Sequence, residues 1–390
     1  MTVRIINADV MDGLRQLPDE SVHCVVTSPP YWGLRDYGVD GQIGMERTLG
    51  EHITRMVAVL REARRVMRKD ATLWLNYGDC YATSVNGRSA ADTKAAGDDD
   101  RTFRDKPFST VGGVLKPKDL CMIPHRLAIA LQEDGWWVRM DNVWAKPNPM
   151  PESITDRPTK SHEYIFLLSK SERYFYDADA IREEAIGTPG GNVRPTKGAG
   201  DDKMRTRNGL HLAQERAREA GGFDGRNKRS VWAIATHPYA EAHFATFPPE
   251  LPEICISAGT SQKGCCAKCG APWERQREKV GERPSHSGSA KPSVLMLERR
   301  GAKSLETSVF ADGMLNVYAT TGWAASCSCN ADIVPSTVLD PFSGAGTTCL
   351  VADRLQRNAI GIELNPEYAA MSERRINGDR GALLDIMEAV

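Results

Sequence analysis

The feature that most constrains the fold is a glycine-rich turn near the carboxyl end of the chain. STVLD (336–340) is apolar enough for a strand, PFSGAG (341–346) follows it, and residues 347–357 have a helical pattern. Small residues let the backbone turn tightly and approach a ligand closely, and a helix start offers unpaired N–H groups. This order is typical of α/β proteins that bind a cofactor where a strand ends.

The next predicted strand adds a carboxylate to the same place. NAIGIE (358–363) ends in Glu363, which follows the turn by roughly the twenty residues typical of ribose-binding acidic groups. The turn lacks the Gly-Lys-Ser or Gly-Lys-Thr continuation of a phosphate-binding loop. We therefore predict a cofactor that has a ribose but no phosphates, and S-adenosylmethionine fits this description. An ordinary surface glutamate is the alternative interpretation of Glu363.

A second motif, TSPPYW (27–32), follows the apolar segment VHCVV (22–26) near the amino end. It should therefore lie at the carboxyl edge of the sheet, where open α/β sheets bind ligands. Pro29 and Pro30 fix φ and carry no N–H, so the Pro29 carbonyl and the Ser28 side chain are free to accept hydrogen bonds. Tyr31 offers a flat face for stacking. Ser28, Pro29, Pro30 and Tyr31 predict a clamp for a planar amino group, with a rigid turn as the alternative.

Strand and helix patterns alternate over much of the chain, which predicts an α/β sheet. Beside the segments already named, we expect strands at 3–6, 71–79, 135–146 and 162–171, helices at 10–17, 50–69, 120–133 and 366–376, and a further strand beginning at YFYD (174–177). The sheet is thus expected to be mostly parallel, twisted, flanked by helices and assembled from both ends of the chain.

Composition sets limits on location and partners. The formal net charge is -1, so any nucleic-acid surface must come from local clusters of Lys and Arg. No apolar run approaches the roughly 20 residues that cross a bilayer, and the first residues lack a signal-peptide pattern. We expect a cytoplasmic protein with no membrane partner.

Together these strings resemble the DNA methyltransferases that modify amino groups, adenine N6 or cytosine N4. The resemblance includes residues 5–38, 141–177, HFATFP (243–248), DPFSGAGTT (340–348) and GIELNPEY (361–368), and the motif order is similar to that of the permuted beta group. It implies a Rossmann-like methyltransferase fold and site-specific transfer of a methyl group from S-adenosylmethionine to the amino nitrogen of a flipped base in duplex DNA. A bacterial or phage-encoded, nucleoid-associated enzyme is expected.

The resemblance also implies roles for individual residues. Asp9 would lie near the cofactor adenine, unless it is only a helix cap, and Phe244 would line the methionine end, unless it is a core aromatic. The whole implied cofactor set is Asp9, Phe244, Thr246, Pro248, Asp340, Phe342, Ser343, Gly344, Gly346, Thr347, Thr348 and Glu363.

The target base stays open between adenine and cytosine. Adenine enzymes of this group commonly have Asp where this chain has Ser28, and serine is more usual among the cytosine-N4 enzymes, but serine can also accept from an adenine amino group. Methylation at cytosine C5 is disfavoured, because it requires a Pro-Cys nucleophile and no Pro-Cys pair occurs.

The target must leave the duplex stack, so we expect base flipping, with Tyr31 and Trp32 stacking on the base. Residues 185–229 are the expected target-recognition region, and a solvated loop is the alternative. Its basic and amide side chains would contact phosphates or base edges: Arg205, Arg207, Asn208, Arg226, Lys228 and Arg229. Residues 1–184, 230–263 and 331–390 would form the catalytic domain, and 264–330 a Cys-rich insertion.

The insertion contains a candidate metal site. Cys266 and Cys269 have the spacing of a zinc knuckle, and Cys327 and Cys329 could supply two further thiolates. Cys265 competes for one position, and free cysteines are the alternative. If zinc binds, its role is expected to be structural.

Two other functions are kept as alternatives: methylation of RNA or of a protein amide, and a DNA-binding relic without catalysis. A homodimer is expected from family likeness. The sequence leaves open whether a restriction nuclease accompanies the protein.

Overall fold

The computed structural model describes residues 1–34, 36, 38–83, 108–183, 226–237, 246–284 and 314–388. The chain forms two compact units. The first contains Met1–Ile181, Arg229–Glu274 and Ala325–Val390, and the second contains Arg182–Lys228 and Arg275–Ala324. The predicted site residues Phe244, Arg205, Arg207 and Asn208 lie outside the described residues.

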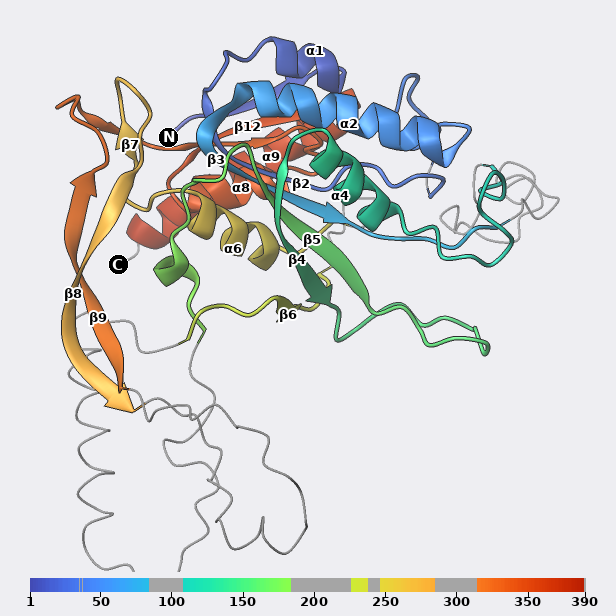
Figure 1. Cartoon of the computed structure of the whole chain (residues 1–390). Coiled ribbons are helices and arrows are strands. Elements are labelled where there is room, and N and C mark those ends of the chain that lie inside the picture. The colour runs from blue at the N-terminus through green and yellow to red at the C-terminus, as the bar shows by residue number, and fades with distance from the viewer. Residues whose placement is uncertain are drawn as a thin grey trace, which may run out of the picture. The chain divides into compact units, whose positions relative to one another are not determined.

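The first unit is built on a sheet of eight strands in the order β1-β12-β11-β2-β3-β5-β4-β6 (Figure 1). Their bounds in that order are Val3–Asn7, Asn358–Glu363, Thr337–Asp340, Val22–Thr27, Met67–Tyr77, His162–Ser169, Trp137–Ala145 and Val231–Ala233. All neighbours pair in parallel except that β5 runs antiparallel to both β3 and β4. The prediction of a mostly parallel sheet is confirmed.

The two strands from the carboxyl end of the chain lie between two strands from the amino end. β12 pairs with β1, where Val3 is opposite Ala359, and β11 pairs with β2, where Leu339 is opposite Val25. The sheet is therefore assembled from both ends of the sequence, as predicted. Because these four strands are parallel, their carboxyl ends, and the loops that follow them, meet at one edge.

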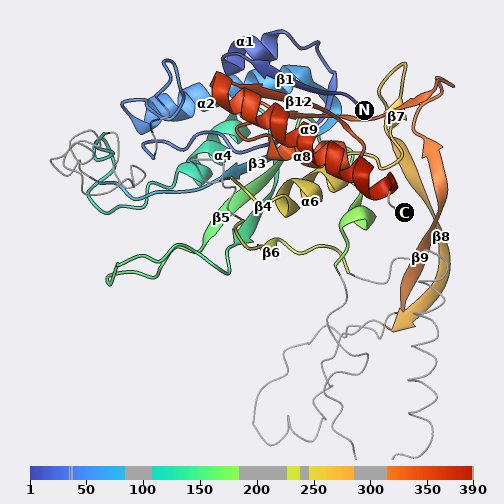
Figure 2. The same cartoon turned by 180° about the vertical axis from the view of Figure 1, so that it is seen from behind.

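Helices cover both faces of the sheet, which explains why its strands are apolar on both sides (Figures 1 and 2). In β3, Leu73 and Leu75 point into one core and Trp74 into the other. The first core receives side chains of α1 (Val10–Arg15), α2 (Leu49–Val66) and α4 (Ile123–Glu133), and the second receives those of α6 (Glu250–Gly259), α8 (Thr347–Arg354) and α9 (Pro366–Glu388). None of the described helices is long and apolar enough to span a membrane.

One predicted strand is wrong. YFYD (174–177) forms no strand and leads into the short 3-10 helix η2 (Ala178–Ile181). Its aromatic residues have high β propensity, but β3 already pairs with β2 and β5, so the segment has no free neighbour there. Two isolated backbone hydrogen bonds hold it instead, from Phe175 N to Asp70 O at 2.8 Å and from Asp177 N to Ala258 O at 2.9 Å.

The segment 264–330 lies outside the eight-stranded sheet wherever it is described. In the first unit β7 (Cys265–Cys266) pairs with β10 (Ile333–Val334) as a short antiparallel ladder. Most of β8 (Trp273–Pro284) and β9 (Met314–Ala325), which pair with each other, belongs to the second unit.

Candidate active site and cysteine cluster

The two motifs at opposite ends of the sequence are joined by a hydrogen bond. Thr27, at the end of β2, donates from Oγ1 to Oδ1 of Asp340, at the end of β11, over 2.7 Å. These residues are 313 positions apart in the sequence. The proline-containing clamp and the glycine-rich turn therefore start side by side at the carboxyl edge of the sheet.

Asp340 is a buried acceptor at this junction. Only 1% of it is exposed, and besides Thr27 it accepts from Thr348 Oγ1 at 2.7 Å and from the N–H of Phe342 at 3.1 Å. Burial raises the pKa of its carboxyl to about 6. The side chain thus ties the turn to the clamp strand and to the start of α8.

The turn itself needs glycine at two positions. Gly344 and Gly346 have φ of +52° and +73°, in the left-handed region that side chains disfavour. A Cβ on Gly346 would also lie 2.0 Å from Oγ of Ser372. The backbone N–H of Gly344 donates to Oε2 of Glu363 at 2.8 Å, and Oε1 of Glu363 accepts from Asn365 N at 2.9 Å. The half-buried carboxylate therefore lies against the turn, and burial raises its pKa.

The remaining predicted cofactor residues lie at the start of α1, at the turn and before α6. Asp9 caps α1, since its Oδ1 accepts from Met11 N at 2.8 Å, which is the alternative given for it above. Ser343, Thr347 and Thr348 are buried at the turn, and Phe342 packs against the first core. Thr246 and Pro248 precede α6, and α6 packs against β2 and α8.

The clamp residues surround a stacked pair of tyrosines. The rings of Tyr31 and Tyr77 are 4.8 Å apart with an interplanar angle of 28°. Ser28 Oγ lies 3.4 Å from the Tyr31 hydroxyl. The Tyr77 hydroxyl donates to the carbonyl of Pro30 at 3.3 Å, whereas the carbonyl of Pro29 accepts no hydrogen bond within the described part of the chain. The Pro29 carbonyl and the Tyr31 ring thus belong to one short loop.

Sequence reasoning missed the group that holds Tyr31. The Tyr31 hydroxyl donates to Oε2 of Glu163 at 2.8 Å, and Asn76 Nδ2 donates to the same oxygen at 3.2 Å. Lys146 forms an ion pair with the other carboxylate oxygen. Burial, and then the charge of Glu163, raise the pKa of Tyr31 well above its usual value, so the ring stays a neutral phenol. A charged residue at the start of the apolar strand HEYIFLLS was the available signal.

Trp32 does not fit its predicted role. Only 2% of it is exposed, and its Nε1 donates to the carbonyl of Glu46 at 2.9 Å. Its ring lies 5.8 Å from that of Phe108. Because the apolar loop folds back into the core, the Trp32 ring offers no face to a base.

The described recognition residues make internal contacts. In the second unit, Arg226 donates from Nε to Glu183 at 3.1 Å, and Lys228 lies 3.9 Å from the same carboxylate. In the first unit, the carbonyl of Arg229 accepts from Trp232 Nε1 at 2.6 Å.

The four predicted metal ligands are together. The thiols of Cys266, Cys269, Cys327 and Cys329 all lie within 4.8 Å of one another. The knuckle turn depends on Gly270, whose φ is +69° and whose N–H donates to Cys266 O at 2.8 Å. Backbone N–H groups of the knuckle lower the pKa of Cys266 to about 7. Cys265 is excluded as a fifth candidate, because its thiol points to the carbonyl of Val334 at 3.4 Å.

Comparison with known proteins decides the family. The profile of the N6/N4 DNA methylase family, described as "DNA methylase", matches residues 22–267 and 327–374. The chain belongs to this family. It is an S-adenosylmethionine-dependent DNA methyltransferase, and it acts on amino groups.

Relatives extend over nearly the whole chain. The type II methyltransferase M.Cfr9I of Citrobacter freundii is 37% identical over 99% of this chain and 91% of its own length. M.XycI of Xanthomonas campestris pv. cyanopsidis is 38% identical with the same coverage, and M.SmaI of Serratia marcescens is 36% identical over 96% of this chain and 90% of its own. The PvuII DNA methyltransferase structure, described as cytosine-N4-specific, shares the fold with a TM-score of 0.50 and 16% identity, covering 98% of this chain and 94% of that one.

Proposed function

We propose that methyl transfer takes place at the sheet edge where β2 and β11 end, with the flipped base on the clamp and the cofactor along the turn. The hydrogen bond between Thr27 and Asp340 carries this proposal, because it fixes the starts of both motifs beside each other. Transfer requires the two reactants to be held within attacking distance, and a shared anchor supports such positioning.

In the proposed site the clamp residues act on the amino group by position and charge. The Pro29 carbonyl and Ser28 Oγ would accept hydrogen bonds from the two N–H groups of the amino group, which draws the nitrogen toward sp³ geometry and aims its lone pair. The nitrogen gains the methyl group and releases one of its two protons. Tyr31 stacks on the base while Glu163 holds its hydroxyl. Ser28 and Tyr31 form no covalent intermediate, so the help is orientation and electrostatics.

The residues at the turn suit S-adenosylmethionine, which supplies the methyl group as a methyl sulfonium. Glu363 stands at the tip of β12, next to the turn, and each of its oxygens keeps a second lone pair for a ribose hydroxyl. The left-handed glycines Gly344 and Gly346 keep the turn free of side chains. Glu363 would hold the ribose, and the glycine turn would let the cofactor approach the backbone closely.

The proposed substrate is duplex DNA, and the amino group is that of adenine or cytosine. The test uses the purified full chain with tritiated S-adenosylmethionine and either duplex DNA or RNA, followed by digestion of the product to nucleosides. We expect label in DNA only, as N4-methylcytosine or N6-methyladenine. Label in RNA, in protein, or at cytosine C5 would overturn the proposal. Sequencing the labelled DNA then maps the recognition site.

We also propose that the four clustered thiols bind one structural zinc ion. Four cysteine ligands close a tetrahedral site, so no position would be left for substrate. The knuckle lies at the opposite edge of the sheet from the clamp, since the carbonyl of Gly270 contacts His23 at the start of β2. Metal analysis of the native protein should give one zinc per chain, and its absence after purification with added zinc would refute the site.

Finally, we propose that residues 185–229 take part in target recognition and that the protein acts as a homodimer. The first proposal rests on the basic and amide side chains of that segment, and the second on likeness to the family. Sedimentation of the full chain with and without duplex DNA would show the oligomeric state directly.

A further inference from the structure

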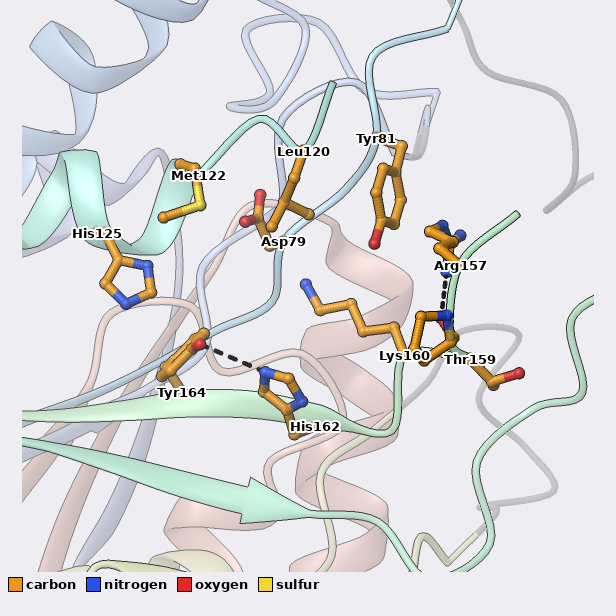
Figure 3. Close-up of a pocket in the computed structure, with 11 residues that line it drawn as sticks. Asp79, Tyr81, Leu120, Met122, His125, Arg157, Thr159, Lys160, His162 and Tyr164 are labelled. Carbon is orange, nitrogen blue, oxygen red and sulfur yellow. Dashed lines mark hydrogen bonds between the residues drawn. The ribbon is translucent and has the colours of Figure 1, made fainter. Parts of the chain in front are cut away.

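A small pocket next to the clamp contains a buried lysine. The cavity has a volume of about 220 Å³ and is lined by residues that follow β3, begin α4 and precede β5. Lys160 Nζ is buried there and has no hydrogen-bond partner among the residues that the structure describes. Figure 3 shows its side chain reaching into the space between Asp79, Tyr81 and His162.

The pocket opens at the edge of the sheet that carries the clamp. β3 ends at Tyr77, whose ring stacks on Tyr31, and Asp79 follows two residues later. β5 starts at His162, and Tyr77 is opposite Tyr164 in the ladder. Clamp and pocket use opposite faces of β5, because Glu163 points toward Tyr31 whereas its two neighbours line the cavity. The pocket is therefore adjacent to the clamp but separate from it.

The charges of the lining favour an anion. Lys160 and Arg157 are cationic and Asp79 is the one carboxylate among the lining side chains. Asp79 is engaged, because its Oδ1 accepts from Cys80 N at 3.0 Å and from Ile123 N at 3.1 Å. Arg157 is engaged too, through Glu152 at 2.7 Å and the ring of Tyr81 at 3.8 Å. Lys160 Nζ makes no hydrogen bond among the described residues. Burial lowers its pKa, and the nearby carboxylates of Asp79 and Glu163 offset this shift only in part.

An enclosed ammonium without a partner costs free energy, and an anionic oxygen removes that cost better than a neutral acceptor does. We propose that this pocket binds a phosphate of the DNA strand next to the flipped nucleotide, with Lys160 as the residue that pairs with it. The inference rests on the proposed function, which places duplex DNA at this edge. Lysine is a common phosphate ligand in DNA complexes, and such a contact positions the strand without reading its sequence.

The test compares Lys160→Met with the wild type in equilibrium binding to duplex DNA at several KCl concentrations. One duplex carries the mapped site and the other a scrambled site. We expect roughly tenfold weaker binding to both at low salt, and a slope of log K against log salt that is smaller by about 0.9. Lys69→Met is the matched control, because Lys69 is an exposed lysine near the start of β3, at the opposite edge, and its slope should equal that of the wild type.

Neutral methylphosphonate linkages, placed singly around the target nucleotide, locate the contact. One linkage should weaken binding of the wild type and leave Lys160→Met unaffected. Lys160→Gln, which keeps donors but no charge, should behave like the methionine variant. The melting temperature of Lys160→Met should not fall, since the lost ammonium makes no hydrogen bond in the described part of the chain.

An unchanged salt slope overturns the proposal. Loss of affinity confined to the specific duplex, with the slope unchanged, would assign Lys160 to a base edge instead. Wild-type affinity and salt slope in Lys160→Gln would equally overturn the proposal, because the positive charge of Lys160 would then play no part in binding DNA. Failure of the proposed function is distinguishable, because in that case the wild type itself would methylate no DNA.

Discussion

The two ends of the strand pair β2 and β11 are held by different hydrogen bonds. At their carboxyl ends, the Thr27 hydroxyl donates to Asp340. At their amino ends, His23 Nδ1 accepts from Thr337 N at 3.1 Å, and its Nε2 donates to the knuckle carbonyl of Gly270 at 3.0 Å. Both sets of hydrogen bonds join segments that are distant in the sequence, but the first lies beside the predicted clamp and cofactor residues, whereas the second lies beside the cysteine knuckle.

That contrast separates the edge proposed to bind base and cofactor from the edge that contacts the cysteine knuckle. At the carboxyl edge the Pro29 carbonyl has no partner in the described part of the chain, and Glu363 retains spare lone pairs. At the amino edge both nitrogens of His23 are used, and burial lowers the pKa of its imidazole to about 4, so it stays neutral. Changes at the first edge should therefore affect chemistry, and changes at the second should affect stability.

The largest expected effect is on catalysis at the carboxyl edge. Ser28→Ala removes one of the two proposed acceptors for the amino group, so the rate of methyl transfer should fall by about 10²–10³-fold. The affinity for S-adenosylmethionine should change less than about twofold, because Ser28 is not part of the turn. Single-turnover kinetics and calorimetric titration measure the two quantities. An equal loss of cofactor affinity would contradict the clamp assignment.

At the turn we expect the opposite result, a loss of cofactor affinity. Gly344→Val places a branched side chain at φ +52° and disturbs the N–H that reaches Glu363, so affinity for S-adenosylmethionine should fall by at least about 100-fold. Gly50→Ala is the control, since a Cβ there would approach only Thr48 Oγ1, at 4.0 Å. Calorimetry checks both variants, and wild-type affinity in Gly344→Val would show that the cofactor binds elsewhere.

At the amino edge we expect a change in stability and not in binding. Cys327→Ser removes one of four proposed zinc ligands, and the melting temperature should fall on the order of 5 °C. Cofactor affinity should stay within about twofold, because the knuckle contacts the starts of the strands. Cys349→Ser, a buried cysteine outside the cluster, serves as a comparison for zinc content, which it should leave intact. Full zinc content in Cys327→Ser would contradict the ligand set.

The sequence predicted those parts of the site that depend on local pattern. The glycine turn, the proline motif and the knuckle are each short motifs whose conformation follows from their own residues. The presence of a mostly parallel sheet around them followed from the alternation of strands with helices, whereas the order of its strands came only from the structure. Contacts between strands that are distant in the sequence could not be predicted in the same way. Glu163 was missed because its role depends on the β3–β5 ladder, and Trp32 was misplaced because the sequence did not show that its loop folds back into the core.

Glu163 provides a smaller and sharper test of the carboxyl edge. Glu163→Ala removes the acceptor of the Tyr31 hydroxyl, so the ring should be positioned less well and kcat should fall about tenfold. Tyr31→Phe should cost a similar factor, and the double variant should cost little more than either alone, because both remove the same bond. Glu163→Gln should recover part of the activity, since its amide oxygen still accepts. Additive losses in the double variant would mean that Glu163 does not act through Tyr31.

The smallest effect concerns the pH dependence of stability at the same edge. Burial raises the pKa of Asp340 to about 6, above the value of an exposed carboxyl, so the folded protein binds this proton more readily than the unfolded chain does. The contribution of Asp340 to the free energy of unfolding is therefore largest below the unfolded pKa and is lost as the pH rises through 6. Asp340→Asn keeps the shape of the side chain and one acceptor oxygen but does not titrate. Relative to the wild type, the variant should lose about 1 kcal/mol of stability between pH 7 and pH 5, as measured by urea unfolding. Because an ionised Asp340 also fastens Thr27 and Thr348, parallel curves for the two proteins would mean that these hydroxyls offset the desolvation of the carboxylate completely.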